Sequence, residues 1–156
     1  MEKREFEARI LASSIRYYRI AKAMLRNDAD CEDAMQEAML NAWKHLPSLK
    51  NHEYFDTWLC RILINECKRQ IRRSRRKQTD PLLESYPAPQ PPEPLLWEAL
   101  QRLDSRYRLP LTMHHANGNT LEETARILGL PVSTVKWRVH RGKQLLSNLL
   151  EKENAL

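Results

Sequence analysis

Residues 74–94 read SRRKQTDPLLESYPAPQPPEP and contain most of the nine prolines of the chain. Proline has no backbone N–H donor and favours the extended polyproline II conformation, so no packed element is expected here. Loops of this length without structure are uncommon inside a compact domain. The stretch therefore predicts two domains, over residues 1–77 and 95–156, joined by a linker over residues 78–94. A long loop within a single domain is the alternative.

The segments on both sides of this linker are predicted to be helical. Apolar residues between Phe6 and Met24 recur at helical spacing, and an apolar stripe of mostly alanine and methionine follows a cap at Asp30 and stops at Pro47. The remaining helices are expected over residues 54–73, 96–103, 106–117, 120–128 and 132–150. Because no alternating strand pattern is present, the predicted fold class is all-α, with two small helical domains.

The charge of the chain favours a polyanionic partner. The formal net charge is +6 and the isoelectric point is near 9.4, which fits nucleic acid or an anionic membrane surface, with a solubilising surface as the alternative. No apolar run approaches the roughly 18 residues that a membrane span requires. The start, MEKREFEAR, lacks the apolar core of a signal peptide. We therefore expect a cytoplasmic protein with no membrane insertion.

The residues that usually carry catalysis or bind metals form no recognisable constellation. The cysteines, Cys31, Cys60 and Cys67, include no CxxC pair and are interpreted as small buried hydrophobic residues. The pair His114-His115 is interpreted as part of a helix surface, and no paired acidic cluster indicates a two-metal site. We therefore expect no metal, no cofactor and no enzymatic activity, including none on nucleic acids.

Residues 120–144, TLEETARILGLPVSTVKWRVHRGKQ, carry the signals of a helix-turn-helix. Thr120 and Glu123 form a capping box that starts a helix near residue 121. Gly129 can adopt the left-handed conformation that ends a helix, and Pro131 suits the start of the next one. In a helix-turn-helix the second helix enters the major groove of DNA.

The second helix of this motif has one apolar and one polar face. At about 3.6 residues per turn, the apolar face contains Val135, Val139, Gly142, Leu146 and Leu149. The other side presents hydrogen-bond donors and flat rings, from Ser133, Lys136, Trp137, His140, Arg141 and Gln144. Such groups suit phosphates, base edges and thymine methyl groups, and a solvated basic face is the alternative. An exposed tryptophan is costly without a partner, so Trp137 contacts either DNA or the preceding helix.

The first domain has a polar helix face of its own. Within residues 54–73 it contains Trp58, Arg61, Asn65, Lys68 and Arg72. Cations, an amide and an aromatic ring are the groups that bind single-stranded nucleic acid. The run KRQIRRSRRK adds affinity for phosphates, with a flexible basic tail over residues 75–77 as the alternative. The preceding helix has a largely acidic side that is expected to face solvent or a basic protein, formed by Glu32, Asp33, Gln36, Glu37 and Asn41.

Two blocks of the sequence resemble bacterial sigma factors. The block DADCEDAMQEAMLNAWKHLPSLKNHEYFDTWLCRILINECKRQIRR resembles sigma region 2. The block LDSRYRLPLTMHHANGNTLEETARILGLPVSTVKWRVHRGKQLL resembles sigma region 4. A chain with only these two regions and a linker is similar to the extracytoplasmic-function (ECF) group.

The resemblance implies a promoter-specificity subunit that binds core RNA polymerase and promoter DNA. In region 2 it implies a contact with the clamp coiled coil of the polymerase through Asp33, Gln36 and Glu37. It also implies capture of the opened, single-stranded −10 element by Phe55, Trp58, Arg61, Asn65, Lys68 and Arg72. In region 4 it implies recognition of the duplex −35 element by Ser133, Thr134, Lys136, Trp137, His140 and Arg141.

Further partners follow from the same resemblance. The first helices of region 4 are expected to contact the polymerase flap, and an anti-sigma factor is an expected partner. Many relatives have a small residue at the position of Trp137, so the bulky ring here is expected to change the −35 preference. The alternative function is a free-standing DNA-binding regulator that uses only the helix-turn-helix.

Overall fold

The structure is a computed structural model that describes residues 1–77 and 94–154. The described residues are predominantly helical and contain no strand, which confirms the predicted all-α fold. They fall into two compact units, Met1–Tyr86 and Pro87–Leu156. The predicted linker, residues 78–94, lies outside the described residues except for its last residue. In the described part of the chain, no helix is both long and apolar enough to cross a membrane.

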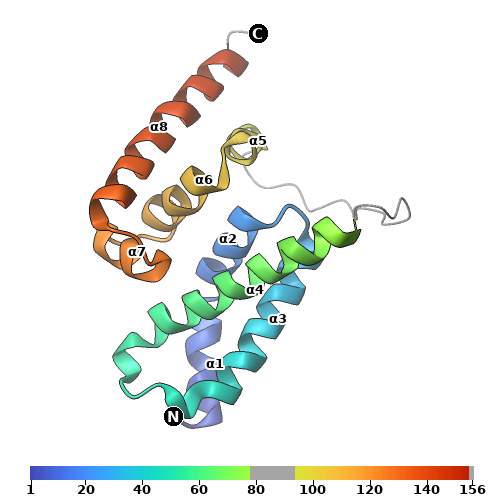
Figure 1. Ribbon diagram of the computed structural model, residues 1–156, viewed down its shortest axis with the longest axis vertical. Helices are drawn as coiled ribbons and strands as arrows, with labels where there is room; N and C mark the ends of the chain where they lie inside the picture. Colours follow the sequence, from blue (N-terminus) through green and yellow to red (C-terminus); the bar gives the residue numbers. More distant parts are fainter. Residues whose placement is uncertain (78–93, 155–156) are drawn as a thin grey trace. The chain divides into compact units, whose positions relative to one another are not determined.

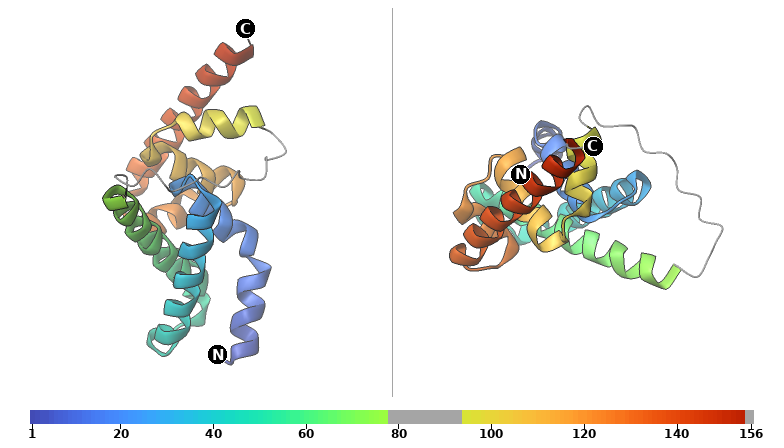
Figure 2. Two further views of the ribbon diagram at one scale, coloured as in Figure 1. Left: turned by 90° about the vertical axis from the view of Figure 1, so that its right-hand side faces the viewer. Right: turned by 90° about the horizontal axis from the view of Figure 1, so that it is seen from above.

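The first unit is a bundle of α1 (Lys3–Ala12), α2 (Ser14–Met24), α3 (Asp28–His45) and α4 (Phe55–Lys77). Two short 3-10 turns, Leu46–Ser48 and His52–Tyr54, connect α3 to α4. Figures 1 and 2 show α3 and α4 running side by side. The contact is close because α3 presents small buried residues to α4, namely Cys31, Ala34, Ala38 and Ala42. On α4, Leu59, Leu63 and Cys67 are each 0% exposed.

The cysteines confirm the sequence interpretation. Cys31, Cys60 and Cys67 are buried free thiols. Burial raises the pKa of each thiol to about 12. They therefore pack as small hydrophobic residues and stay protonated at neutral pH.

The ends of two helices in the first unit differ from the prediction. The cap of α3 is Asn27, whose side chain accepts a hydrogen bond from the backbone N–H of Asp30 at 3.0 Å. The prediction of Asp30 as the cap was wrong, because Asp30 lies in the first turn, where its charge suits the helix N-terminus. The apolar pattern before residue 24 also forms two helices, which are separated at Ser13.

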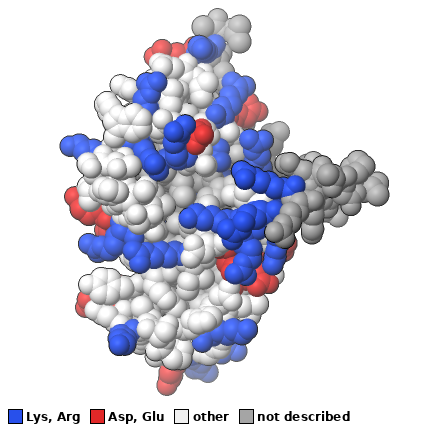
Figure 3. Space-filling view, viewed as in Figure 1, with Lys and Arg blue, Asp and Glu red and all other residues white. Residues whose placement is uncertain are grey.

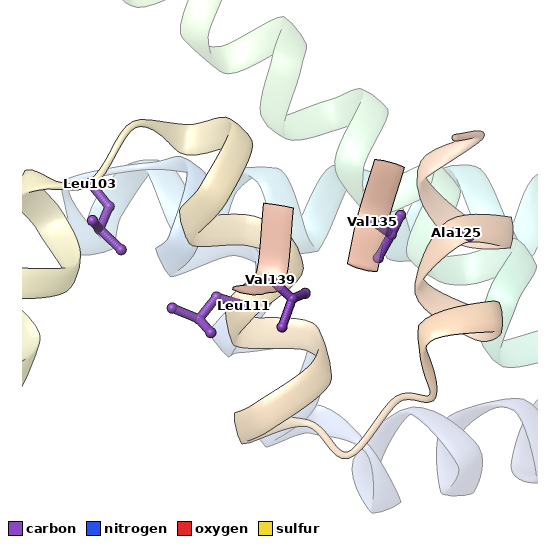
Figure 4. Close-up of a cluster of buried hydrophobic side chains, with 5 residues drawn as sticks. All are labelled: Leu103, Leu111, Ala125, Val135 and Val139. Carbon is purple, nitrogen blue, oxygen red and sulfur yellow. The ribbon is translucent and has the colours of Figure 1, made fainter. Parts of the chain in front are cut away.

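The second unit contains α5 (Pro94–Arg102), α6 (Ser105–Leu111), a π turn (Thr112–Ala116), α7 (Leu121–Leu128) and α8 (Val132–Asn154). Its core contains Leu103, which directly follows α5, Leu111 of α6, Ala125 of α7, and Val135 and Val139 of α8. Figure 4 shows these five residues. The core therefore fixes which side of α8 is left at the surface.

Candidate nucleic-acid interface

The turn between α7 and α8 has the local geometry of a helix-turn-helix. The hydroxyl of Thr120 accepts a hydrogen bond from the backbone N–H of Glu123 at 3.0 Å, which caps α7. Gly129 ends α7 with φ 67° and ψ 36°, in the left-handed region that glycine occupies without strain. The carboxylate of Glu123 accepts from Asn119 Nδ2 at 3.1 Å. These contacts confirm the predicted cap and turn.

Two buried valines orient α8. Val135 and Val139 are 0% and 5% exposed and pack into the core of the second unit. Gly142 continues the same buried line, and Tyr107 of α6 lies against it. The opposite side of α8 therefore faces outward.

This outward face carries the residues that are predicted to recognise the −35 element. Ser133, Lys136, Trp137, His140 and Arg141 are exposed, and Thr134 is half-buried. Gln144 connects two of them, since its Oε1 accepts from Arg141 Nη1 and its Nε2 lies 3.4 Å from His140 Nε2. The face combines two cations, an indole and an imidazole on one rigid helix.

Trp137 is both exposed and in contact with another helix. Its side chain is 57% exposed, while its ring centroid lies 6.0 Å from that of Tyr107 in α6. The guanidinium of Arg106 lies 5.2 Å from the centre of the Tyr107 ring. Sequence reasoning missed Tyr107 and Arg106, because only the packing of α6 on α8 brings them beside the outward face.

The first unit presents a second basic face, along α4. Arg61, Asn65, Lys68 and Arg72 are exposed, and Trp58 is half-buried. Leu59 and Leu63 are 0% exposed on the other side of α4 and hold the helix in this orientation. Further exposed cations follow toward its C-terminal end, and Figure 3 shows Lys and Arg side chains gathered where α4 ends. The predicted stripe is thus brought together on one surface.

Phe55 does not belong to this surface. It is 3% exposed, and its ring packs edge-on against Phe6 with centroids 5.8 Å apart. Phe55 precedes Leu59 by four residues and therefore shares its buried side of the helix. The aromatic ring that reaches the surface is Trp58, whose centroid lies 6.0 Å from that of Phe55. We correct the prediction for Phe55 and assign it to the core.

The acidic side of α3 is also at the surface, with one change. Asp33, Gln36 and Glu37 are exposed. Asn41 instead turns toward α4, because its Nδ2 donates to Glu66 Oε1 at 2.7 Å. Leu40, the residue before Asn41, is 61% exposed and follows the acidic residues on the surface of α3.

Trp43 adds a further apolar surface one turn along α3. It is 42% exposed although its ring lies 5.2 Å from that of Phe6. Trp43 belongs to the apolar stripe that the sequence predicts between Asp30 and Pro47, and the sequence did not single out Leu40. The exposed side of α3 is therefore acidic at its N-terminal half and carries two large apolar side chains, Leu40 and Trp43, beyond it.

The two adjacent histidines have a structural contact. His114 Nδ1 lies 2.7 Å from the backbone oxygen of Asn119, and the rings of His114 and His115 are 4.9 Å apart. Within residues 1–77 and 94–154, no group of three or more His, Cys, Asp or Glu side chains is arranged to hold a metal ion.

Comparisons with known proteins match both halves of the chain. A family model for sigma-70 region 2 matches residues 12–77, and one for sigma-70 region 4 matches residues 94–146. The ECF RNA polymerase sigma factor SigM of Mycobacterium tuberculosis is 32% identical over 138 residues, covering 85% of this chain and 70% of SigM. SigW of Bacillus subtilis, also an ECF sigma factor, is 29% identical over 156 residues, covering 85% and 82%.

A solved structure agrees with these sequence matches. The sigma factor RpoE from Bartonella quintana, in complex with the anti-sigma factor NepR, matches with a TM-score of 0.82 and 25% identity, over 94% of this chain and 97% of RpoE. The two matched regions account for most of the chain and follow one another in the order that the sequence indicated. The chain therefore belongs to the sigma-70 family of RNA polymerase sigma factors, as a member of the ECF group with regions 2 and 4.

Proposed function

We propose that three exposed faces of this chain let it act as a promoter-specificity subunit of RNA polymerase. The outward face of α8 binds the −35 duplex, the basic face of α4 binds the opened −10 strand, and the acidic side of α3 binds core polymerase. Two observations carry the proposal together: the exposed sides of α3 and α4 in the first unit have opposite charge, and the second unit contains a helix-turn-helix. The chain positions the polymerase and catalyses no step itself.

The domain boundaries that we propose are residues 1–77 and 95–156, with a linker over residues 78–94. The ends of the two family matches, at residues 77 and 94, support these boundaries. In this scheme the first helices of the second domain contact the polymerase flap. We also propose an anti-sigma factor as a partner, since RpoE of Bartonella quintana forms a complex with NepR.

The function as a whole is tested by transcription from defined templates. Purified chain and core RNA polymerase are incubated with a library of genomic fragments, and run-off transcripts are sequenced. We expect capture of the chain by core polymerase and new transcripts that start downstream of a shared −35 and −10 pattern. A chain that binds DNA selectively but is not retained by core polymerase would instead be a free-standing regulator.

Recognition of the −35 element is expected to divide between Arg141 and Lys136. If Arg141 makes a bidentate contact with a guanine edge, Arg141→Ala costs about 1–3 kcal/mol and relaxes specificity at one position. If Lys136 contacts a phosphate, Lys136→Ala weakens all sequences alike and lowers the salt slope by about one unit. Titration of −35 variants at several salt concentrations distinguishes the two.

The control for this experiment is Lys152→Ala, which removes an exposed cation near the C-terminal end of the same helix. It should leave both specificity and salt slope unchanged. Equal binding of every −35 variant by Arg141→Ala and by the parent would show that α8 is not the reading helix.

Capture of the −10 strand is expected to depend on Trp58 and Asn65. Stacking of one base on an aromatic side chain contributes about 1–3 kcal/mol, so Trp58→Ala with Asn65→Ala should impair promoter opening. Binding to the −35 duplex should persist. Permanganate footprinting of the holoenzyme on promoter DNA reports the opened thymines and is expected to show their loss.

Trp58 is half-buried, so the thermal stability of the variant that combines Trp58→Ala with Asn65→Ala has to be compared with that of the parent protein. Asn65→Ala alone, at an exposed position, is the variant that leaves the packing intact. Full permanganate reactivity in both variants would show that this face of α4 does not contact the −10 strand.

A further inference from the structure

We propose that Trp137 reads the C5-methyl group of one thymine in the −35 duplex, and that Tyr107 holds the indole ring in position for this contact. The inference rests on the proposed function of α8 as the −35 reading helix. It adds the chemical feature of the base that is read and assigns roles to Tyr107 and Arg106.

Trp137 lies in the middle of the outward face of α8. Ser133 precedes it by four residues and Arg141 follows it by four, so the three lie along one line of the helix. His140 lies one turn further on the same face, and all four residues are exposed. A base edge that meets Arg141 in the major groove therefore also lies within reach of the indole.

The chemistry of the ring selects the kind of base contact. An indole has one N–H donor and no acceptor, so it cannot form the bidentate pairs that identify guanine or adenine. Its remaining surface is apolar, and the C5-methyl of thymine is the apolar group that the major groove displays. A ring that is 57% exposed has the surface to cover such a methyl group.

Tyr107 restricts where the indole can lie. The two ring planes are inclined by 53° with centroids 6.0 Å apart, which is a favourable arrangement for an aromatic pair. Tyr107 is itself anchored, because a Cβ atom placed on Gly142 would lie 3.4 Å from the Tyr107 Cβ. The backbone of α8 thus approaches Tyr107 closely, and the tyrosine is a positioning residue for Trp137.

Arg106 supplies charge beside the aromatic pair. Its guanidinium lies 5.2 Å from the Tyr107 ring centre, and its Nε lies 3.4 Å from Asp104 Oδ1. Arg106 is exposed, so its donors are placed at the edge of the proposed interface. It is expected to contact phosphate, and Arg106→Ala to weaken all −35 sequences by the same factor.

The test removes the methyl group and nothing else. A preferred −35 sequence is first selected by the holoenzyme from duplexes with randomised bases. Each thymine of this sequence is then replaced singly by deoxyuridine, which keeps all hydrogen-bonding groups. We expect a loss of about fourfold in affinity at one thymine for the parent, the effect of one buried methyl-sized group.

The variants assign this loss to residues. Trp137→Ser should bind the thymine and deoxyuridine duplexes equally, whereas Trp137→Phe, which keeps an apolar ring, should retain part of the difference. Tyr107→Ala should reduce the difference and Tyr107→Phe should preserve it. Arg106→Ala should bind more weakly with the difference unchanged. Because each result is a ratio within one protein, a general loss of stability does not produce it.

Two results would overturn the inference. Equal affinity of the parent for every deoxyuridine duplex would show that no methyl group is read, and a difference that persists in Trp137→Ser would assign the methyl contact to another residue. Failure of the proposed function is distinguishable, since the holoenzyme would then select no −35 sequence at all.

Discussion

Replacing Lys22 by methionine is expected to lower the free energy of unfolding of the first unit by about 3 kcal/mol. Lys22 Nζ lies 2.6 Å from Asp28 Oδ1, and the side chains are 9% and 21% exposed. The Tyr18 hydroxyl donates to the same oxygen at 2.6 Å. Removal of one partner from a buried ion pair leaves an uncompensated charge and costs about 3–5 kcal/mol. We expect the lower end because the Tyr18 hydroxyl still donates to Asp28 Oδ1 after the lysine is removed.

Hydrogen exchange at the amides of α2 and α3 measures this loss in the first unit alone. The matched control combines Lys22→Met with Asp28→Asn, which removes the charge but keeps an acceptor for Tyr18. This double variant should regain most of the lost stability. If it is as unstable as Lys22→Met, the effect comes from packing of the lysine stem and not from the ion pair.

The same pair predicts how stability depends on pH. Burial raises the pKa of Asp28, but the hydrogen bonds from Lys22 and Tyr18 outweigh it and hold the pKa below its ordinary value of about 3.9. A depressed pKa in the folded state stabilises the fold above the unfolded pKa, and this contribution is lost as the pH falls through the folded pKa. Lys22→Met should flatten this acid dependence of the free energy of unfolding.

Local signals were sufficient to predict the helix-turn-helix. A capping hydroxyl at Thr120, a glycine at position 129 and a long amphipathic pattern after it act within one or two turns of the chain. Their effects do not depend on distant residues, so α7, the turn and the faces of α8 follow from the sequence. The cap of α3 is a local feature as well, but NDAD offers several capping side chains, and Asn27 forms the bond.

The edges of helix faces depend on tertiary contacts and were not predictable in the same way. Asn41 and Leu40 are neighbours on α3, and only the hydrogen bond to Glu66 of α4 decides that the amide turns inward. The sequence predicts that Phe55 is exposed for stacking on a base, but in the structure Phe6 of α1 packs against its ring. The contact of Trp137 with Tyr107 likewise joins two helices whose separation in the chain gives no signal.

Charge reversal on α3 is expected to have the largest effect on assembly with the polymerase. Asp33→Arg together with Glu37→Arg should weaken binding to core polymerase by about 3 kcal/mol, roughly a hundredfold in Kd. The two carboxylates lie one turn apart on the exposed side of α3, next to Gln36. A basic surface that approaches this side would meet two positive charges where it otherwise meets two negative ones. Competition for core polymerase against a labelled parent chain measures the change.

The helix itself should tolerate both substitutions. Asp33 and Glu37 are exposed, and α3 is held by its opposite side, where Ala34 and Ala38 are 0% exposed. Exposed substitutions of this kind usually change stability by less than about 0.5 kcal/mol. The matched control is Glu7→Arg with Glu53→Arg, which changes the net charge by the same amount at exposed positions of the same unit. Since non-specific electrostatics would affect both pairs equally, a loss confined to the α3 pair identifies that face as the polymerase contact. Unchanged affinity with full helicity would exclude it.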